Sequence, residues 1–164
     1  MILILGRFQP LHNGHMKVIR DVLAEDNDLV IAIGSPGKRN QKNNPFSGEE
    51  RKDMLERTLK ALKIPARILF VPDRPSDEGY VEHVIEQIGS RPDKIITENP
   101  WTIDIFGKAG YKVVVTERHF ELSSTYIRNR ISEGKEWEHL VPKQVAEFVK
   151  KIGGIERIKK AYSG

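Results

Sequence analysis

The regular alternation of short apolar runs with longer stretches of helical periodicity is the feature that most constrains this chain. The runs are rich in β-branched residues, and together with the intervening helices they predict a parallel sheet covered by helices on both faces. We expect about five strands, over residues 2–5, 29–33, 67–71, 94–97 and 112–115. The sequence therefore predicts an α/β fold with a doubly wound parallel sheet.

The helical stretches can be placed from their apolar spacing and their caps. The apolar residues between Met16 and Leu23 recur at helical spacing and predict a helix over about residues 15–24. Ser47 followed by Glu50 is a capping-box signature for a second helix. From residue 123 onward the pattern is wholly helical, with segments over 126–131, 141–152 and 156–161. We expect these segments to form a helical cap on the sheet edge.

Length and composition limit the domain organisation and the environment. The 164 residues fit a single domain, with an α/β core over 1–122 and a helical C-terminal part over 123–164, and no Gly, Ser or Pro-rich linker separates the two parts. The chain has no cysteine, which excludes disulfides and thiolate metal sites. The opening apolar run meets Arg7 after six residues, too early for a signal sequence or a membrane span. We predict a cytoplasmic protein with no membrane partner.

The charge pattern suits a polyanionic ligand but favours no particular one. The net charge is +4, and the basic residues are spread along the chain instead of forming an arm or tail. An ordinary solvated surface explains this balance better than nucleic-acid binding, because no basic surface with interleaved aromatic residues is evident. We expect no nucleic-acid partner.

The segment GRFQPLHNGH, residues 6–15, lies where the first strand ends and the first helix begins. Ligands bind at the carboxyl ends of open parallel sheets, and a helix N-terminus offers unpaired N–H groups to phosphate. His12 and His15 are three residues apart, so both imidazoles lie near this helix start, and Gly14 lets a phosphate approach the backbone closely. The alternative interpretation is two unrelated polar residues beside a plain N-cap at Asn13.

A second helix start of the same kind occurs in SSTYIRNRI, residues 123–131. Hydroxyl residues at a helix start offer side-chain and amide donors, and Arg128 adds a positive charge about one turn later. Alternatively, Ser123 or Ser124 is merely an N-cap. Cap and ligand roles are compatible, so Arg128 is the residue that discriminates between the two interpretations.

Together these motifs resemble the nucleotidyltransferase superfamily with the HxGH signature, and GRFQPLHNGH is similar to the opening of the archaeal-type nicotinamide mononucleotide adenylyltransferases. NPFSGEER, residues 44–51, resembles that family's Asn-Pro-Phe-Thr-Ala-Gly-Glu-Arg segment, and SSTYIR resembles its second signature. Similarities at 98–100, 110–111 and 137–142 extend the resemblance over nearly the whole chain. The resemblance implies a Rossmann-like core.

The resemblance also implies an activity and a set of site residues. The activity is transfer of AMP from ATP to nicotinamide mononucleotide, giving NAD and pyrophosphate, with Mg²⁺ carried by ATP and pyrophosphate and no metal site on the protein itself. The residues it makes catalytic are His12, His15 and Arg128. Those it assigns to ATP are Gly6, Arg7, Phe8, Gln9, Gly14, Arg51, Asn99, Ser123, Ser124 and Thr125. Those it assigns to the mononucleotide are Ser35, Asp73 and Tyr80. It further implies a homo-oligomer.

Departures from the family's pattern leave the acceptor open. Tyr80 stands where the family usually has Trp, and Asp77 stands where it often has Asn. Tyr80 either stacks on the flat ring of the acceptor or packs against the sheet as an ordinary helix residue with Val84 and Ile88. Another phosphomonoester such as FMN, used with ATP or CTP, and a non-catalytic nucleotide sensor are the alternative functions. Trp137 and His139 lack a phosphate-like context and are assigned to packing.

Overall fold

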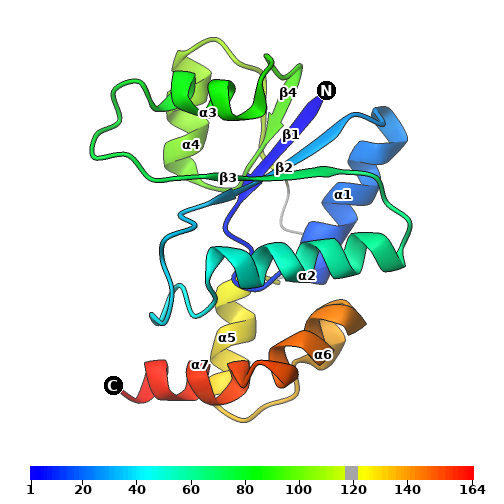
Figure 1. Ribbon diagram of the computed structural model, residues 1–164, viewed down its shortest axis with the longest axis vertical. Coiled ribbons are helices and arrows are strands. Elements are labelled where there is room, and N and C mark those ends of the chain that lie inside the picture. The colour runs from blue at the N-terminus through cyan, green and yellow to red at the C-terminus, as the bar shows by residue number, and fades with distance from the viewer. Residues whose placement is uncertain (117–121) are drawn as a thin grey trace.

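A computed structural model describes residues 1–116 and 122–164, and its centre is a five-stranded parallel sheet (Figure 1). The strand order is β3-β2-β1-β4-β5, and Ile4 at the centre pairs with Ile31 on one side and Ile96 on the other. The strands are β1 (Ile2–Gly6), β2 (Leu29–Gly34), β3 (Arg67–Val71), β4 (Lys94–Ile96) and β5 (Val113–Val114). The predicted strands are confirmed, and their ends differ from the prediction by at most one residue.

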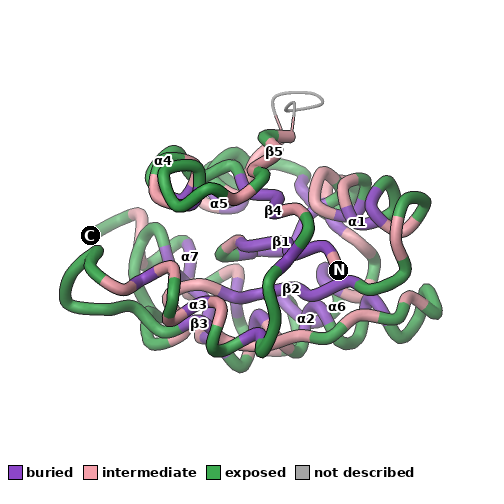
Figure 2. The backbone as a smooth tube through the Cα atoms, turned by 90° about the horizontal axis from the view of Figure 1, so that it is seen from above, coloured by how far each residue is buried: buried purple, intermediate pink, exposed green. Residues whose placement is uncertain are grey.

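Helices cover both faces of the sheet because alternate strand residues point to opposite sides. Ile2 and Ile4 lie in the core cluster shared with α1 (Asn13–Glu25) and α2 (Gly48–Ala61). Leu3 and Leu5 lie in the cluster shared with α3 (Tyr80–Ile88) and α4 (Pro100–Lys108). Figure 2 shows the central strands as a buried layer between helices whose outer sides are exposed. The doubly wound, Rossmann-like fold is therefore confirmed.

The C-terminal part is helical, as predicted, but lies elsewhere than predicted. Its elements are α5 (Ser124–Ser132), the short 3₁₀ helix η1 (Glu138–Leu140), α6 (Lys143–Lys151) and α7 (Gly154–Ser163). The expectation of a cap on the sheet edge is wrong. Helix α2 contacts β2 and β3 on one side and α6 on the other, so it lies between the sheet and the C-terminal helices (Figure 1). Phe148 and Ile158 are buried in the same cluster as Met54 of α2.

The residues predicted to cap a helix or to pack in the core are confirmed in part. The capping box at the start of α2 is present, with Ser47 Oγ accepting from the backbone N–H of Glu50 and the Glu50 carboxylate accepting from that of Ser47. Trp137 is buried in the core, as predicted, whereas His139 is exposed, so its assignment to packing is wrong. No helix in the described parts of the chain is long and apolar enough to cross a membrane.

Gly154, at the first turn of α7, sets how closely this helix approaches the core. A Cβ atom there would lie 2.9 Å from the Phe46 ring and 2.9 Å from Cγ1 of Val149. We therefore expect Gly154→Ala to lower the free energy of unfolding by about 1 to 3 kcal/mol, because the buried neighbours must move. Urea unfolding measures this change.

The matched control is Gly107→Ala in α4, where an added Cβ meets nothing within 4 Å. Alanine has the higher helix propensity, so the control should leave the free energy of unfolding unchanged or raise it by up to about 1 kcal/mol. A Gly154→Ala protein as stable as the Gly107→Ala protein would contradict the close packing of α7.

Candidate active site

A cavity of about 770 Å³ opens at the carboxyl ends of the strands. Strand β1 continues into α1 on one face and β4 continues into α4 on the other, so the chain diverges between these neighbouring strands. Ligands of open α/β sheets bind at such a switch point, and the volume is that of an ordinary small-molecule site. The cavity brings together every predicted site residue except Arg51.

His12 and His15 cap helix α1 with their own side chains. Nδ1 of His12 accepts hydrogen bonds from the backbone N–H groups of Gly14 (3.1 Å) and His15 (3.3 Å). In return, Nδ1 of His15 accepts from the backbone N–H of His12 at 3.1 Å, which completes a capping box. An Nδ1 that accepts a hydrogen bond carries no proton, so each neutral ring carries its proton on Nε2. Both rings therefore retain an Nε2–H donor.

Desolvation keeps both imidazoles uncharged. His12 is 3% exposed, and its burial lowers its pKa to about 4. Burial also lowers the pKa of His15 well below its ordinary value, and the adjacent His12 lowers it further. The two rings stack with their centroids 3.6 Å apart, and the Phe8 ring lies 4.8 Å from that of His15. At neutral pH the pair is therefore two neutral donors in fixed positions.

The start of α1 differs from the prediction in two respects. The helix begins at Asn13, two residues earlier than expected, and its N-cap is His12 and not Asn13. The backbone N–H groups of Gly14 and His15 are engaged by His12, so they are not the free phosphate donors that the sequence predicts. A Cβ atom at Gly14 would lie 2.9 Å from Cε1 of His12, so this glycine makes room for the imidazole.

Arg51 is the clearest correction, because it does not line the cavity. The side chain is fully buried, and its guanidinium donates only to backbone carbonyls. Nε donates to Ser47 (3.1 Å), Nη1 to Arg7 (2.8 Å) and Gly34 (2.9 Å), and Nη2 to Ser35 (2.9 Å). Burial lowers the pKa of Arg51 to about 10, and the nearby Arg7 contributes. Arg51 therefore joins the ends of β1 and β2 to the start of α2.

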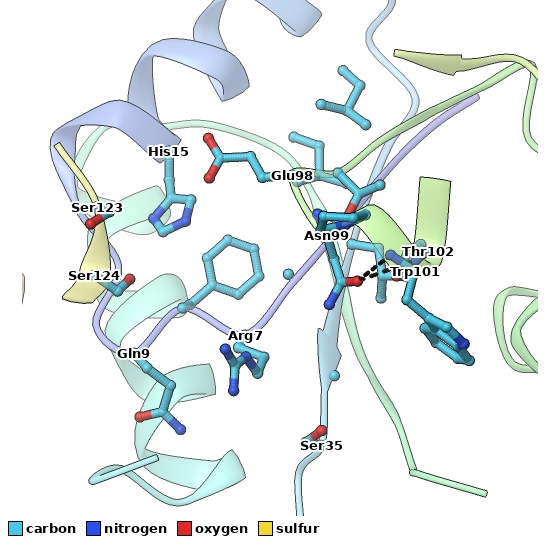
Figure 3. A pocket seen from close by; sticks show the side chains of 18 of the residues that line it. Arg7, Gln9, His15, Ser35, Glu98, Asn99, Trp101, Thr102, Ser123 and Ser124 are labelled. Atoms are coloured by element: carbon cyan, nitrogen blue, oxygen red, sulfur yellow. Dashed lines mark hydrogen bonds between the residues drawn. The ribbon is translucent and has the colours of Figure 1, made fainter. Parts of the chain in front are cut away.

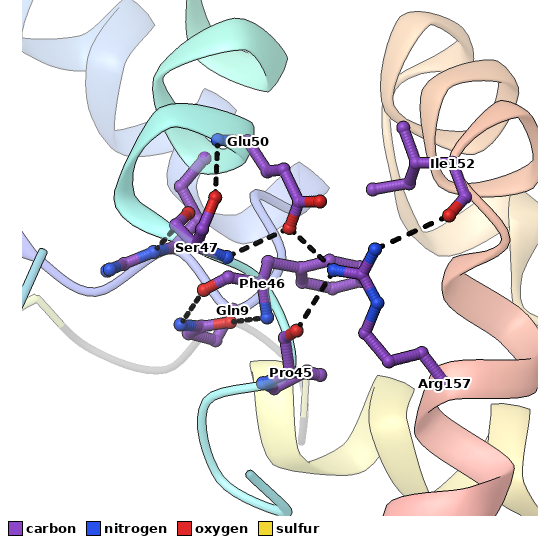
Figure 4. Close-up of polar contacts among 8 residues, drawn as sticks. Gln9, Pro45, Phe46, Ser47, Glu50, Ile152 and Arg157 are labelled. Carbon is purple, nitrogen blue, oxygen red and sulfur yellow. Dashed lines mark hydrogen bonds and ion pairs between the residues drawn. The ribbon is translucent and has the colours of Figure 1, made fainter. Parts of the chain in front are cut away.

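The side chain of Gln9 also binds the protein's own backbone. Gln9 lies at the cavity (Figure 3). Its amide Nε2 donates to the carbonyl of Phe46 (2.9 Å), and its Oε1 accepts from the Phe46 backbone N–H (3.0 Å) (Figure 4). Arg157 of α7 donates to the carbonyl of Pro45 (3.2 Å) and pairs with the carboxylate of Glu50 (2.6 Å) (Figure 4). The C-terminal helix thus supports the segment that holds Gln9 under the cavity, an interaction that no sequence motif indicated.

The second signature is brought to the first, as predicted. Ser123 caps α5, and the hydroxyl of Ser124 donates to the carbonyl of Pro10 at 2.9 Å. Arg128 is 3% exposed, and it donates from Nη1 to the carbonyl of Gln9 (2.9 Å) and from Nη2 to Thr125 Oγ1 (3.2 Å). Its Nε is buried without a partner among the described residues, and burial lowers its pKa.

The cations of this half of the cavity have no carboxylate partner within the described residues. The hydrogen-bond acceptors of Arg128 are a carbonyl and a hydroxyl, and that of Arg7 is Asn44 Oδ1 at 3.4 Å. A buried guanidinium without an anion is costly, so this arrangement suits an anionic ligand.

The opposite half of the cavity contains the residues predicted for the mononucleotide. The Ser35 hydroxyl donates to Asp73 Oδ1 at 2.8 Å. Tyr80 is only 8% exposed and shares a core cluster with Val84 and Ile88, so the packing interpretation describes its position. The predicted stacking face of Tyr80 is largely covered because its ring packs against Trp101, at a centroid distance of 4.7 Å.

Trp101 and Glu98 are among the cavity residues that the sequence analysis did not assign to the site. Trp101 is 38% exposed, and Glu98 directs its carboxylate toward the side of the cavity that contains His15 (Figure 3). Asn99 lies between them, where its Oδ1 caps α4 by accepting from the backbone N–H groups of Trp101 and Thr102. Their position directly after β4, at the ligand-binding edge of the sheet, was the available signal.

Comparison with known proteins agrees with this geometry. Residues 3–130 match the family described as cytidylyltransferase-like. The nicotinamide-nucleotide adenylyltransferase of Thermococcus sibiricus is 41% identical over 162 residues, covering 96% of this chain and 87% of that protein. The enzyme of the same name from Thermococcus onnurineus is 39% identical over 160 residues, covering 96% and 86%.

A solved structure supports the fold. It is a bifunctional NMN adenylyltransferase/ADP ribose pyrophosphatase from Francisella tularensis, complexed with AMP and a manganese ion, and it superposes with a TM-score of 0.76 at 21% identity. The match covers 99% of this chain and 52% of that one, so the chain spans about half the length of the bifunctional protein.

With the parallel sheet and the cavity at its carboxyl ends, these matches identify the protein as a nucleotidyltransferase. The chain belongs to the cytidylyltransferase-like family and, within it, to the nicotinamide-nucleotide adenylyltransferases.

The low pKa of His12 makes stability depend on pH. The unfolded chain binds a proton at this residue below about pH 6.5, whereas the folded chain does so only near pH 4. The free energy of unfolding therefore rises with pH between these two values, and the contribution of His12 is complete above about pH 6.5. We expect His12 alone to account for a loss of about 2 kcal/mol between pH 7 and pH 5. Urea unfolding at both pH values measures the loss.

The control for this prediction is His12→Asn, whose Oδ1 can still accept from the start of α1 but takes no proton. Its loss between pH 7 and pH 5 should be smaller by about 2 kcal/mol. Equal pH dependence in the two proteins would contradict a neutral, buried His12.

Proposed function

We propose that the protein transfers the adenylyl group of ATP to nicotinamide mononucleotide, forming NAD and pyrophosphate. The observation that carries this proposal is the buried Arg128 guanidinium, which lacks a carboxylate partner in the described chain and lies with two Nε2–H imidazoles at the switch point of the sheet. Such a cluster suits a polyphosphate. The relatives named above supply the acceptor.

ATP would occupy the half of the cavity between the two helix starts. His12 and His15 would donate through Nε2–H to the α- and β-phosphates, and Arg128 would neutralise the triphosphate together with the exposed Arg7. Ser123 and Thr125, at the start of α5, add hydroxyl groups on the same side. The Asn99 side chain, engaged through Oδ1 at α4, leaves its amide nitrogen for the nucleoside (Figure 3).

The reaction needs alignment and charge stabilisation more than proton transfer. A phosphate oxygen of the mononucleotide attacks the α-phosphorus, and the bond from that phosphorus to the bridging oxygen of pyrophosphate breaks in line. The acceptor phosphate is ionised near neutral pH, so no general base is required. Fixed donors placed where negative charge develops lower the barrier without reorganising during the step.

The neutral state of the histidines suits this role. Each Nδ1 is engaged by the backbone, so each ring can present only Nε2–H to a phosphate. The anionic phosphates favour the protonated form of a nearby imidazole and therefore raise its pKa when they bind. Protonation could occur only at Nδ1, however, where it would break the capping hydrogen bonds at the start of α1, so we expect both rings to stay neutral and to donate from Nε2.

We propose Mg²⁺ as the metal that accompanies ATP. Within the described residues no group of three or more potential ligands could hold a metal. Asp73 and Asp77 line the cavity and accept from Ser35 and Trp101. Glu98 lies on the side of His15 and accepts from Thr116 Oγ1 through Oε1 at 3.3 Å, so its Oε2 can face a ligand (Figure 3). These residues fit a magnesium ion held mainly by phosphate oxygens, with Glu98 as one protein ligand. Such an ion neutralises phosphate charge.

An acceptor panel tests the proposal. Purified protein is incubated with ATP, Mg²⁺ and, in parallel, nicotinamide mononucleotide, nicotinic acid mononucleotide or FMN, and dinucleotide and pyrophosphate are quantified. We expect NAD and pyrophosphate in equal amounts from nicotinamide mononucleotide. Dinucleotide formation from FMN alone would overturn the acceptor, and tight ATP binding without turnover on any acceptor would indicate a nucleotide sensor.

Substitutions at His15 test the role of its Nε2. His15→Ala should reduce kcat on the order of 10²-fold, since one preorganised donor is lost where charge develops. His15→Asn retains an acceptor near the Nδ1 position but has no donor at the Nε2 position, so it should be as impaired as alanine. His15→Gln extends an amide N–H toward the Nε2 position and should recover part of kcat.

The matched control is His139→Ala, because this exposed histidine contributes no side chain to the cavity. It should leave kcat unchanged. A His15→Asn protein with normal kcat would remove the Nε2–H donor from the mechanism.

A further inference from the structure

Trp101 differs from the other aromatic residues of the cavity because its side chain is exposed there. It is 38% exposed and lines the cavity on the side of Asp73 and Asp77. Phe8 and Tyr80 also line the cavity, but they are only 2% and 8% exposed. A large apolar surface held open inside a binding cavity is a candidate ligand contact.

The indole is fixed at three points. The backbone N–H of Trp101 donates to Asn99 Oδ1 at 2.9 Å, which places the residue in the first turn of α4. Its Nε1–H donates to Asp77 Oδ2 at 3.1 Å, across from the segment before α3. The Tyr80 ring packs against the indole at an interplanar angle of 61°, an edge contact that leaves Trp101 38% exposed.

Tyr80 supports the indole and cannot present a comparable face. Its ring contacts Trp101 on one side and Phe106 on the other, with centroid distances of 4.7 and 6.5 Å. Its helix neighbours Val84 and Ile88 are fully packed in the same cluster. Exposing the Tyr80 ring would require α3 to separate from this core.

We infer that Trp101 supplies the face on which the pyridinium ring of the acceptor stacks, and that Asp77 is the positioning residue that holds the indole in place. This inference rests on the proposed function. A pyridinium ring is flat and cationic, and tryptophan is the side chain whose face attracts a cation most strongly. The Asp77 carboxylate beside the indole suits a positive ring, whereas Asp73 on the same side of the cavity is paired with Lys38.

Tryptophan fluorescence tests the inference directly. The chain contains two tryptophans, and the second, Trp137, is buried in the core, so a Trp137→Phe background leaves Trp101 as the only indole. In that background nicotinamide mononucleotide alone should quench the emission in a saturable manner, because a stacked pyridinium accepts charge from the excited indole. ATP alone should not quench it.

Steady-state kinetics give an independent readout. Trp101→Ala should raise KM for nicotinamide mononucleotide roughly 3- to 30-fold and leave KM for ATP within about 2-fold, as expected for the loss of one stacking contact. Trp101→Phe should retain an intermediate KM. Asp77→Ala should raise the same KM, and Asp77→Asn, which can still accept from Nε1–H, should restore it.

The outcomes separate this inference from the proposed function. NAD formation with an unchanged mononucleotide KM in Trp101→Ala and no quenching would overturn the role of Trp101 while leaving the activity intact. Quenching by ATP alone would overturn the assignment of this face to the acceptor. Failure of the wild-type protein to form NAD would overturn the proposed function, and saturable quenching by the mononucleotide would then still support its stacking on Trp101.

Discussion

The buried guanidinium of Arg51 is the interaction on which the active-site region depends. It donates to four backbone carbonyls, at the ends of β1 and β2 and at the start of α2. Irregular backbone at the end of a sheet leaves carbonyls without ladder partners, and burying them unpaired is costly. Arg128 and Arg157 act similarly on the carbonyls of Gln9 and Pro45. Arginine suits this task because one planar group carries five N–H donors.

The same need to satisfy backbone polar groups determines the chemistry of the histidine pair. His12 and His15 satisfy the start of α1 with Nδ1, and this use of one nitrogen leaves only the other for a ligand. Burial lowers the pKa of both rings and keeps them neutral at physiological pH. A structural requirement, the capping of a helix, thereby fixes the tautomer that the proposed reaction uses.

Much of this architecture follows from the sequence, and the exceptions have physical causes. The strand positions follow from apolar runs buried on both faces, and the gathering of two helix starts at one edge follows from parallel topology. The role of Arg51 does not, because a sequence motif cannot tell whether a cation faces a ligand or the backbone of distant strands. The burial of Tyr80 and the exposure of Trp101 could not be predicted for a similar reason, since both depend on how α3 and α4 pack together. The position of the C-terminal helices could not be predicted either, because it depends on α2 packing against the sheet on one side and against α6 on the other.

Catalysis as proposed here depends on His12 and His15 being neutral and carrying their protons on Nε2. Long-range ¹H–¹⁵N correlation spectra of the five histidine rings report tautomer and charge directly, with His12→Asn and His15→Asn providing the assignments. These two rings should show an unprotonated Nδ1 and a protonated Nε2, without titration between pH 7 and pH 5. A proton on Nδ1 of either ring, or a titration near pH 6.5, would contradict it.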